Sequence, residues 1–146
     1  MEQSFNSNFT VAAKPSTVYN ALTNDVCKWW TEQATCACNV GDLLNVRFED
    51  NTHWVMTIAE ASPCQSLVWH VTEAFHDLHN LPNKDEWLGT NIIWRLTEQK
   101  FSTQISLLHD GLIPSLSCYP ICRDGWQHYL NSLKKYLESG QGDPYH

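Results

Sequence analysis

The chain has 146 residues, of which 42% are hydrophobic and 17% charged, a composition typical of one globular domain and not of a disordered chain. Its formal net charge of −7 argues against nucleic acid or an anionic membrane surface as a partner, because both attract basic proteins. No apolar run reaches the length of a membrane span, and the N-terminal residues lack the pattern of a secretion signal. We therefore expect a cytoplasmic protein that does not insert into membranes.

The first thirty residues contain one strand pattern and two short helical patterns. Residues 5–11 alternate between apolar and polar side chains, which predicts an opening strand. Pro15 suits the first turn of a helix, and the apolar positions up to Leu22 predict a short helix. Residues 26–30 predict a second one. Both helices are too short to form a layer between parallel strands, so we expect them to turn the chain at a corner.

Strand patterns fill the middle of the chain. The predicted strands are a weak one at residues 35–39 and clearer ones at 44–48, 53–58, 67–72, 90–96 and 103–109. Short turns between most of them indicate an antiparallel sheet. The polar segment 75–87 breaks the rhythm and predicts a long loop, and loops of this kind often carry function in compact domains.

Residues 118–140 carry the long helical pattern of the sequence. The residues on its apolar arc are Cys122, Trp126, Tyr129, Leu130, Leu133 and Leu137. Gly125 lies at the edge of this arc, where a missing side chain brings the helix closer to its neighbours or leaves space for a ligand. Gly140 suits the C-terminal cap of the helix, and residues 141–146 are expected to form a flexible tail.

The order of these elements predicts an α+β fold. A twisted antiparallel sheet of six to seven strands curls, and a long amphipathic helix laid across its concave face buries the apolar surfaces of both. We expect a single domain over residues 1–140, with the two short helices after the first strand.

Six cysteines raise the question of disulfides or metal. In a reducing compartment the expected state is a free thiol. The pairs Cys36/Cys38 and Cys118/Cys122 offer a four-thiolate zinc site as an alternative, although their spacings differ from those of zinc ribbons.

The loop offers a second metal alternative, because His76, Asp77 and His79 lie within four residues. Histidines in loops are more often solvated. No nucleotide-binding or nucleophile motif is present. We predict no metal and no cofactor.

Several segments together resemble a known family. They are residues 9–13 with Pro15, Val18 and residues 19–22; Lys28-Trp29-Trp30; Gly41; Leu67-Val68-Trp69; Trp87-Leu88-Gly89-Thr90; His109-Asp110-Gly111-Leu112; and Gly125-Trp126 with Leu130, residues 133–134 and 136–140. In order and spacing the chain resembles the branch related to the activator of Hsp90 ATPase, within the START/Bet v 1-like (SRPBCC) superfamily.

This resemblance implies a helix-grip fold with a deep cavity between the sheet and the C-terminal helix. Such cavities suit lipids, sterols, polyketides or other apolar molecules, and relatives include binders, carriers and a few enzymes. The co-chaperone that names the branch carries a separate N-terminal domain, for which this chain has no room. Stimulation of Hsp90 is therefore not implied.

Seven tryptophans in so short a chain suit the walls of a small-molecule cavity as well as a core. The candidate ligand-binding residues are Trp69, Trp87, Trp94, Trp126, Tyr129, Cys122, Leu107 and His109. His109 and His70 are candidate catalytic residues, since a histidine in the cavity can act as a general base. The alternative for His109 is a hydrogen bond to a backbone group that caps the sheet.

We therefore predict a protein that binds a hydrophobic or aromatic molecule, lipid-like or polyketide-like, between sheet and helix. One alternative is a cyclase or hydratase that uses a cavity histidine. A second is a co-chaperone-like interaction module, which predicts a contiguous exposed apolar patch. A homodimer is open to the protein if the first strand leaves a free sheet edge.

Overall fold

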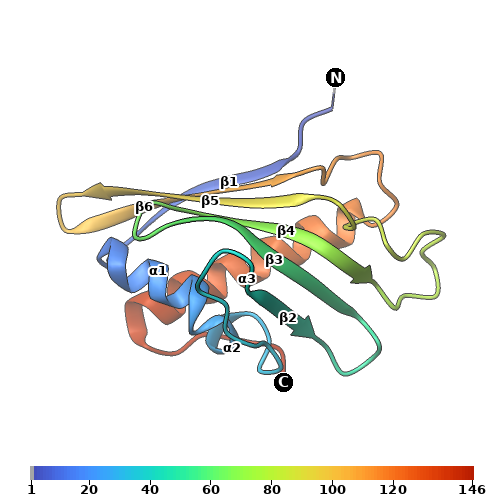
Figure 1. The fold of residues 1–146 in the computed structure, drawn as a ribbon, viewed down its shortest axis with the longest axis horizontal. Helices are drawn as coiled ribbons and strands as arrows, with labels where there is room; N and C mark the ends of the chain where they lie inside the picture. The colour runs from blue at the N-terminus through green and yellow to red at the C-terminus, as the bar shows by residue number, and fades with distance from the viewer. Residues whose placement is uncertain (1) are drawn as a thin grey trace.

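A computed structural model describes residues 2–146 and confirms the predicted α+β helix-grip architecture (Figure 1). The elements are β1 (Phe5–Val11), α1 (Pro15–Thr23), α2 (Val26–Trp29), β2 (Leu43–Arg47), β3 (His53–Ser62), β4 (Ser66–Phe75), β5 (Asn91–Gln99), β6 (Ser102–Asp110) and α3 (Tyr119–Ser139). The six strands form one antiparallel sheet in the order β1-β6-β5-β4-β3-β2, so β1 and β2 are its edges.

The weak strand predicted at residues 35–39 is wrong, and the described sheet has six strands and not seven. The carboxylate of Asp42 accepts hydrogen bonds from the backbone N–H groups of Cys38 and Asn39, at 3.1 and 2.9 Å. These bonds fold the segment into a turn before β2. An isolated bridge joins Ala34, just before this segment, to Val46 of β2.

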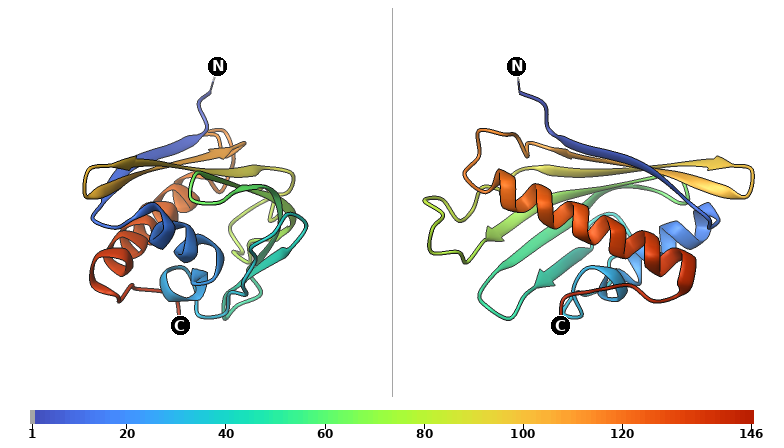
Figure 2. Two further views of the ribbon diagram at one scale, coloured as in Figure 1. Left: turned by 60° about the vertical axis from the view of Figure 1, so that its left-hand side comes forward. Right: turned by 180° about the vertical axis from the view of Figure 1, so that it is seen from behind.

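All three helices lie on the same side of the curved sheet, and α3 runs along that side (Figure 2). The predicted apolar arc of α3 faces the sheet: Cys122, Trp126, Leu130 and Leu133 are buried, and Tyr129 and Leu137 are half-buried against the core. Alternate residues of β3 to β6 point inward and meet this arc, as their burial patterns show. The core therefore lies between the concave face and α3.

Trp30, directly after α2, stands at the centre of this core. Six other rings lie within 6.5 Å of it, measured between ring centroids: Trp29, Trp54, Trp69, Trp87, Trp126 and Tyr129. The nearest is Trp126 of α3, at 5.1 Å. Trp30 thus connects α2 and α3 with the sheet through aromatic contacts.

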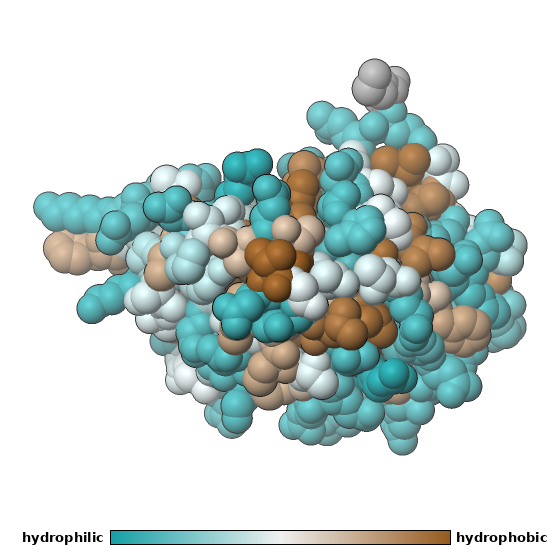
Figure 3. Space-filling view, viewed as in Figure 1, coloured by the Kyte–Doolittle hydropathy of each residue, from teal (hydrophilic) through white to brown (hydrophobic). Residues whose placement is uncertain are grey.

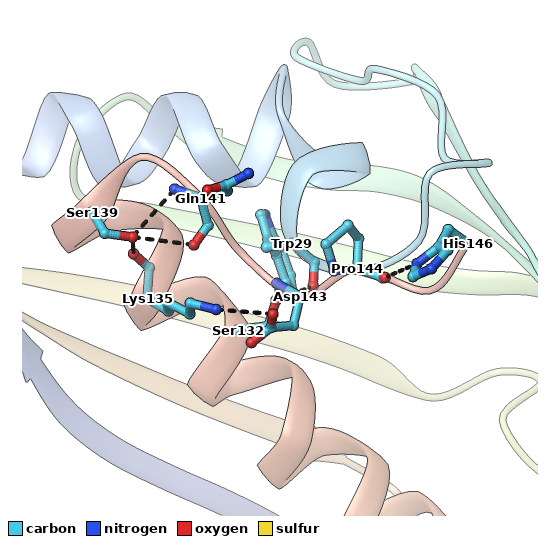
Figure 4. Close-up of polar contacts among 8 residues, drawn as sticks. All are labelled: Trp29, Ser132, Lys135, Ser139, Gln141, Asp143, Pro144 and His146. Carbon is cyan, nitrogen blue, oxygen red and sulfur yellow. Dashed lines mark hydrogen bonds and ion pairs between the residues drawn. The ribbon is translucent and has the colours of Figure 1, made fainter.

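Residues 141–146, for which the sequence predicts a flexible tail, lie against the helices (Figure 4). Ser132 of α3 donates a hydrogen bond to the carbonyl of Trp29 and accepts one from the backbone N–H of Asp143, both at 2.7 Å. The amine of Lys135 lies 3.0 Å from the Asp143 carboxylate. The backbone of Tyr145 then bonds to Trp30 and Glu32. These contacts hold the segment beside α2, and its mobility stays a prediction.

The surface exposes few large hydrophobic side chains. On the face seen in Figure 3 they form small groups among hydrophilic residues. The exposed ones among the described residues are Val40, Leu43, Leu88, Phe101 and Ile121. None of the helices that the structure describes has the length and apolar character to cross a membrane.

Trp30→Ala is expected to lower the free energy of unfolding by about 3–5 kcal/mol, because it empties the centre of the aromatic cluster. Urea unfolding followed by circular dichroism measures the change. The control is Phe101→Ala, which removes an aromatic side chain that is 89% exposed and is expected to change stability by less than about 0.5 kcal/mol. Equal losses in the two variants would contradict the central role of Trp30.

Candidate functional site

A cavity of about 280 Å³ opens between the inner face of the sheet and α3. Most of its wall is aromatic. Trp30, Trp54, Trp87 and Trp126 supply indole rings, and Phe48, Tyr129 and Tyr145 complete the wall. Trp87 stacks on Trp54 at 4.2 Å between centroids, and its ring lies within 6° of parallel to that of Trp126. These rings therefore pack against one another and form a continuous aromatic wall.

A small number of polar groups interrupt this wall. Asp50 and Thr52 lie between β2 and β3, and Thr52 donates its backbone N–H to Asp50 at 2.9 Å. His76 follows β4, and its ring packs edge-on against Trp54 at 5.5 Å. Cys122 contributes a thiol from the first turn of α3. An apolar pocket with a few polar groups is the usual form of a small-molecule site.

Gly125 leaves the helical side of the cavity open. A Cβ atom at this position would have no atom of the described residues within 4 Å beyond its immediate surroundings in the helix. Gly125 is one of the residues that line the cavity. A glycine within a helix lowers stability by about 1 kcal/mol relative to alanine. At this position it leaves space in the cavity next to Trp126.

The loop before β5 is fixed to α3 by a carboxylate. Glu86 accepts hydrogen bonds from the backbone N–H groups of Ser117 and Cys118 and from the hydroxyl of Ser117. Partial burial raises the pKa of Glu86, but these hydrogen bonds to its charged form outweigh it and leave the pKa below its ordinary value. Glu86 thereby places the neighbouring Trp87 against Cys122, whose sulfur accepts the indole N–H at 3.2 Å.

His109 is completely buried outside the cavity and takes part in a chain of hydrogen bonds. The indole N–H of Trp126 donates to Nδ1 at 3.0 Å, which makes Nε2 the protonated nitrogen. Nε2 then donates to the hydroxyl of Thr90 at 2.9 Å, and that hydroxyl donates to the carbonyl of Trp87. Burial lowers the pKa of His109 from 6.5 to about 3. A neutral ring with both nitrogens engaged is not a base for a cavity ligand.

Gly111 is needed for this arrangement. Its φ of +110° disfavours other residues, and a Cβ atom here would lie 2.6 Å from the Thr90 side chain. Thr90 can therefore sit over His109 only because residue 111 has no side chain.

The structure separates the eight predicted ligand-binding residues into two groups. Trp87, Trp126, Tyr129 and Cys122 line the cavity. Trp69, Trp94, Leu107 and His109 are fully buried in the core and do not line it. His70, the other catalytic candidate, is half-buried next to the inward-pointing Trp69, and its Nδ1 lies 2.8 Å from the Asn91 side-chain oxygen.

Sequence reasoning missed several residues of the cavity wall, above all Trp30, Trp54, Phe48, His76 and Tyr145. The strand pattern put Trp54 and Phe48 on apolar faces, so a signal for these two existed. His76 and Tyr145 lie in segments without periodicity, and nothing in the sequence places them beside α3.

Among residues 2–146, no three histidine, cysteine or acidic side chains gather in a way that could hold a metal ion. Cys36 and Cys38 bond to Asn24, whereas Cys118 and Cys122 begin α3. All six cysteines are free.

A family model described as activator of Hsp90 ATPase homolog 1-like protein matches residues 12–138. The chain belongs to this family. No curated protein sequence matches it significantly.

Solved structures of similar proteins agree with the family. The Aha1 dimer from Colwellia psychrerythraea has 26% identity and a TM-score of 0.78, with 95% of this chain and 98% of that chain covered. An Hsp90 activator from Plasmodium falciparum has 16% identity and a TM-score of 0.70, with 92% and 96% covered. DynU16, from the dynemicin biosynthetic locus, has 18% identity and a TM-score of 0.72, with 97% and 49% covered. The last two likenesses show the fold.

The buried histidine predicts a pH dependence of stability. The unfolded chain binds a proton at His109 near pH 6.5, whereas the folded protein does so only near pH 3. The free energy of unfolding should therefore fall as the pH drops from about 6.5 towards 3, by at most about 5 kcal/mol from this group.

His109→Gln cannot take up this proton, so it should be less stable than the wild type near pH 7 but lose less stability on acidification. Urea unfolding of both proteins at several pH values measures the two slopes, and other titrating groups cancel in the comparison. Parallel curves would show that His109 is not buried as a neutral ring.

Proposed function

We propose that the protein binds a flat, apolar or aromatic small molecule in the cavity between its sheet and α3. The observation that carries this proposal is a cavity of about 280 Å³ whose wall is mostly aromatic, with four indole rings and the rings of Phe48, Tyr129 and Tyr145. A flat, apolar ring system can pack against a wall of this kind. Each aromatic contact adds about 0.5–1.5 kcal/mol beyond the burial of apolar area.

The volume of the cavity favours a compact ligand. Small-molecule sites usually measure about 300–1,000 Å³, and the 280 Å³ of this cavity lies just below that range. Of the two ligand types expected from the sequence, this size supports a compact polyketide-like ring system over a lipid-like chain.

The enzyme alternative depended on His109 or His70 as a base in the cavity. Since neither residue lines the cavity and both nitrogens of His109 are engaged, the geometry supports binding over catalysis by these two. The interaction-module alternative rests on the family relationship. Only five large hydrophobic side chains of the described residues are exposed, so this alternative has less support than the cavity gives to binding.

A homodimer and a cytoplasmic location complete the proposal. The Colwellia relative is a dimer, and the edge strand β1 has one side without a strand partner in the described sheet, whereas residues 31–35 cover the outer side of β2. Six free thiols suit a reducing compartment. Light scattering during gel filtration measures the oligomeric state.

Native mass spectrometry of protein purified from its own host tests the proposed binding. We expect a retained small molecule, released on denaturation, whose fragmentation identifies an aromatic ring system. In parallel, the purified protein should bind the neutral probe N-phenylnaphthylamine with a rise in probe fluorescence and quenching of tryptophan emission. A protein that retains no molecule and binds no probe would argue against the cavity as a binding site.

Gly125→Leu should fill the cavity from the helical side. We expect it to weaken binding of N-phenylnaphthylamine at least tenfold while changing the free energy of unfolding by less than about 1 kcal/mol, because the new side chain meets open space. Gly125→Ala is the matched control: its small methyl group should stabilise the helix by about 1 kcal/mol and leave binding within about threefold. Unchanged binding in Gly125→Leu, with lower stability, would assign Gly125 to the core alone.

A further inference from the structure

The opening of the cavity carries negative charge. Asp50 lines the cavity and is exposed to solvent, so it lies where the cavity opens. The turn that carries it is closed by a hydrogen bond from the backbone N–H of Phe48 to the carbonyl of Thr52, at 3.0 Å. The Asp50 carboxylate accepts the backbone N–H of Thr52 at 2.9 Å, which fixes its place in the turn. Its neighbour Glu49 accepts a hydrogen bond from the hydroxyl of Tyr145, another lining residue, at 3.4 Å.

The charge of Asp50 has no salt-bridge partner among residues 2–146, because none of the ion pairs between these residues includes it. The wall that these residues form contains no lysine or arginine, and its basic side chain is that of His76. The ammonium of Lys84, in the loop after β4, bonds to the carbonyls of Leu78 and Leu81. A cavity with this charge at its opening favours a cationic ligand over an anionic one.

Aromatic rings meet at an angle beside this carboxylate. Phe48 lies 6.4 Å from Tyr129 and 5.0 Å from Tyr145 between ring centroids, with interplanar angles of 52° and 64°. All three rings are half-buried and line the cavity, and Asp50 follows Phe48 by two residues. Rings inclined to one another bound a space from several sides, as in the aromatic cages that bind quaternary ammonium groups. A cation here would be attracted by the rings and by the carboxylate together.

We propose that the ligand of the cavity carries an alkylated ammonium group, which packs against the aromatic rings at the opening and pairs with Asp50. The inference rests on the proposed function and adds a positive charge to the ring system that the cavity binds. The apolar part of the ligand then packs against the buried indole rings of the wall.

Phenyltrimethylammonium and tert-butylbenzene are a matched pair of probes, because they have the same shape and differ by one positive charge. Titrations followed by tryptophan fluorescence at pH 8, where an ordinary histidine is neutral, measure the two dissociation constants. We expect the ammonium compound to bind about tenfold more tightly. This preference should shrink when the ionic strength rises from about 0.01 M to about 1 M, since salt screens an exposed carboxylate.

Three variants test where the charge is recognised. Asp50→Asn keeps an acceptor for the Thr52 N–H but should weaken phenyltrimethylammonium binding about fivefold, with tert-butylbenzene binding unchanged within about twofold. Glu60→Gln is the matched control: it changes the net charge equally at an exposed position of β3 that does not line the cavity, and should leave both constants unchanged. Gly125→Leu should weaken both compounds. Circular dichroism should show that all variants are folded.

The outcomes distinguish this inference from the proposed function. If tert-butylbenzene binds as tightly as phenyltrimethylammonium, or if Asp50→Asn binds the cation like the wild type, the ammonium inference is overturned and the proposed binding stands. Unchanged binding of the cation to Gly125→Leu would place it outside the cavity and also overturn the inference. If only N-phenylnaphthylamine binds, the inference fails alone, and if none of the three compounds binds, both proposals fail.

Discussion

The packing of Trp30 between α3 and the sheet is the contact on which the rest of the structure depends. Trp30 follows a helix of only four residues, which has no stability of its own, so tertiary packing must fix its position. Its ring meets Trp126 of α3 on one side and Trp69 of β4 on another. Indole rings are large and rigid, so they fill the centre of the core between the sheet and α3. The cavity lies next to them, and Trp30, Trp54, Trp87 and Trp126 belong both to the core and to the cavity wall.

Some buried polar groups of the core have a hydrogen-bond partner and others have none among the described residues. Trp126 donates to a buried neutral histidine, and that histidine donates to Thr90, so both nitrogens of the buried ring and the Trp126 indole N–H are satisfied. Three other buried indole N–H groups, those of Trp54, Trp69 and Trp94, have no partner within the described residues. Those of Trp69 and Trp94 lie deep in the core, where aromatic packing offsets their cost. Trp54 also lines the cavity, but its indole nitrogen is enclosed like those of Trp69 and Trp94.

One side of the cavity combines a small residue, a thiol and two rings on adjacent turns of α3. Gly125 provides space, Trp126 and Tyr129 provide aromatic surface, and Cys122 contributes a thiol. The loop carrying Trp87 brings the hydrogen-bond donor to that thiol, and Glu86 fixes this loop at the start of the helix. Membership of the Hsp90 activator homolog family explains the fold. The side chains named here determine the shape and polarity of the cavity.

The sequence by itself determined the architecture, because the periods of strands and helices are local properties of the chain. Alternation predicted all six strands, β1 to β6, and the arc from Cys122 to Leu137 predicted which side of α3 is buried. Periodicity assigns a residue to a face but not to a depth within the core. Trp69 and Trp94 therefore lie on the predicted face of the sheet. They do not line the cavity, because Trp30 packs on Trp69 and Trp126 packs against Trp94. The tertiary structure alone decided the places of His76, Trp87 and Tyr145, because contacts between residues far apart in the chain, such as Glu86 with Ser117 and Tyr145 with Trp30, position the segments that carry them.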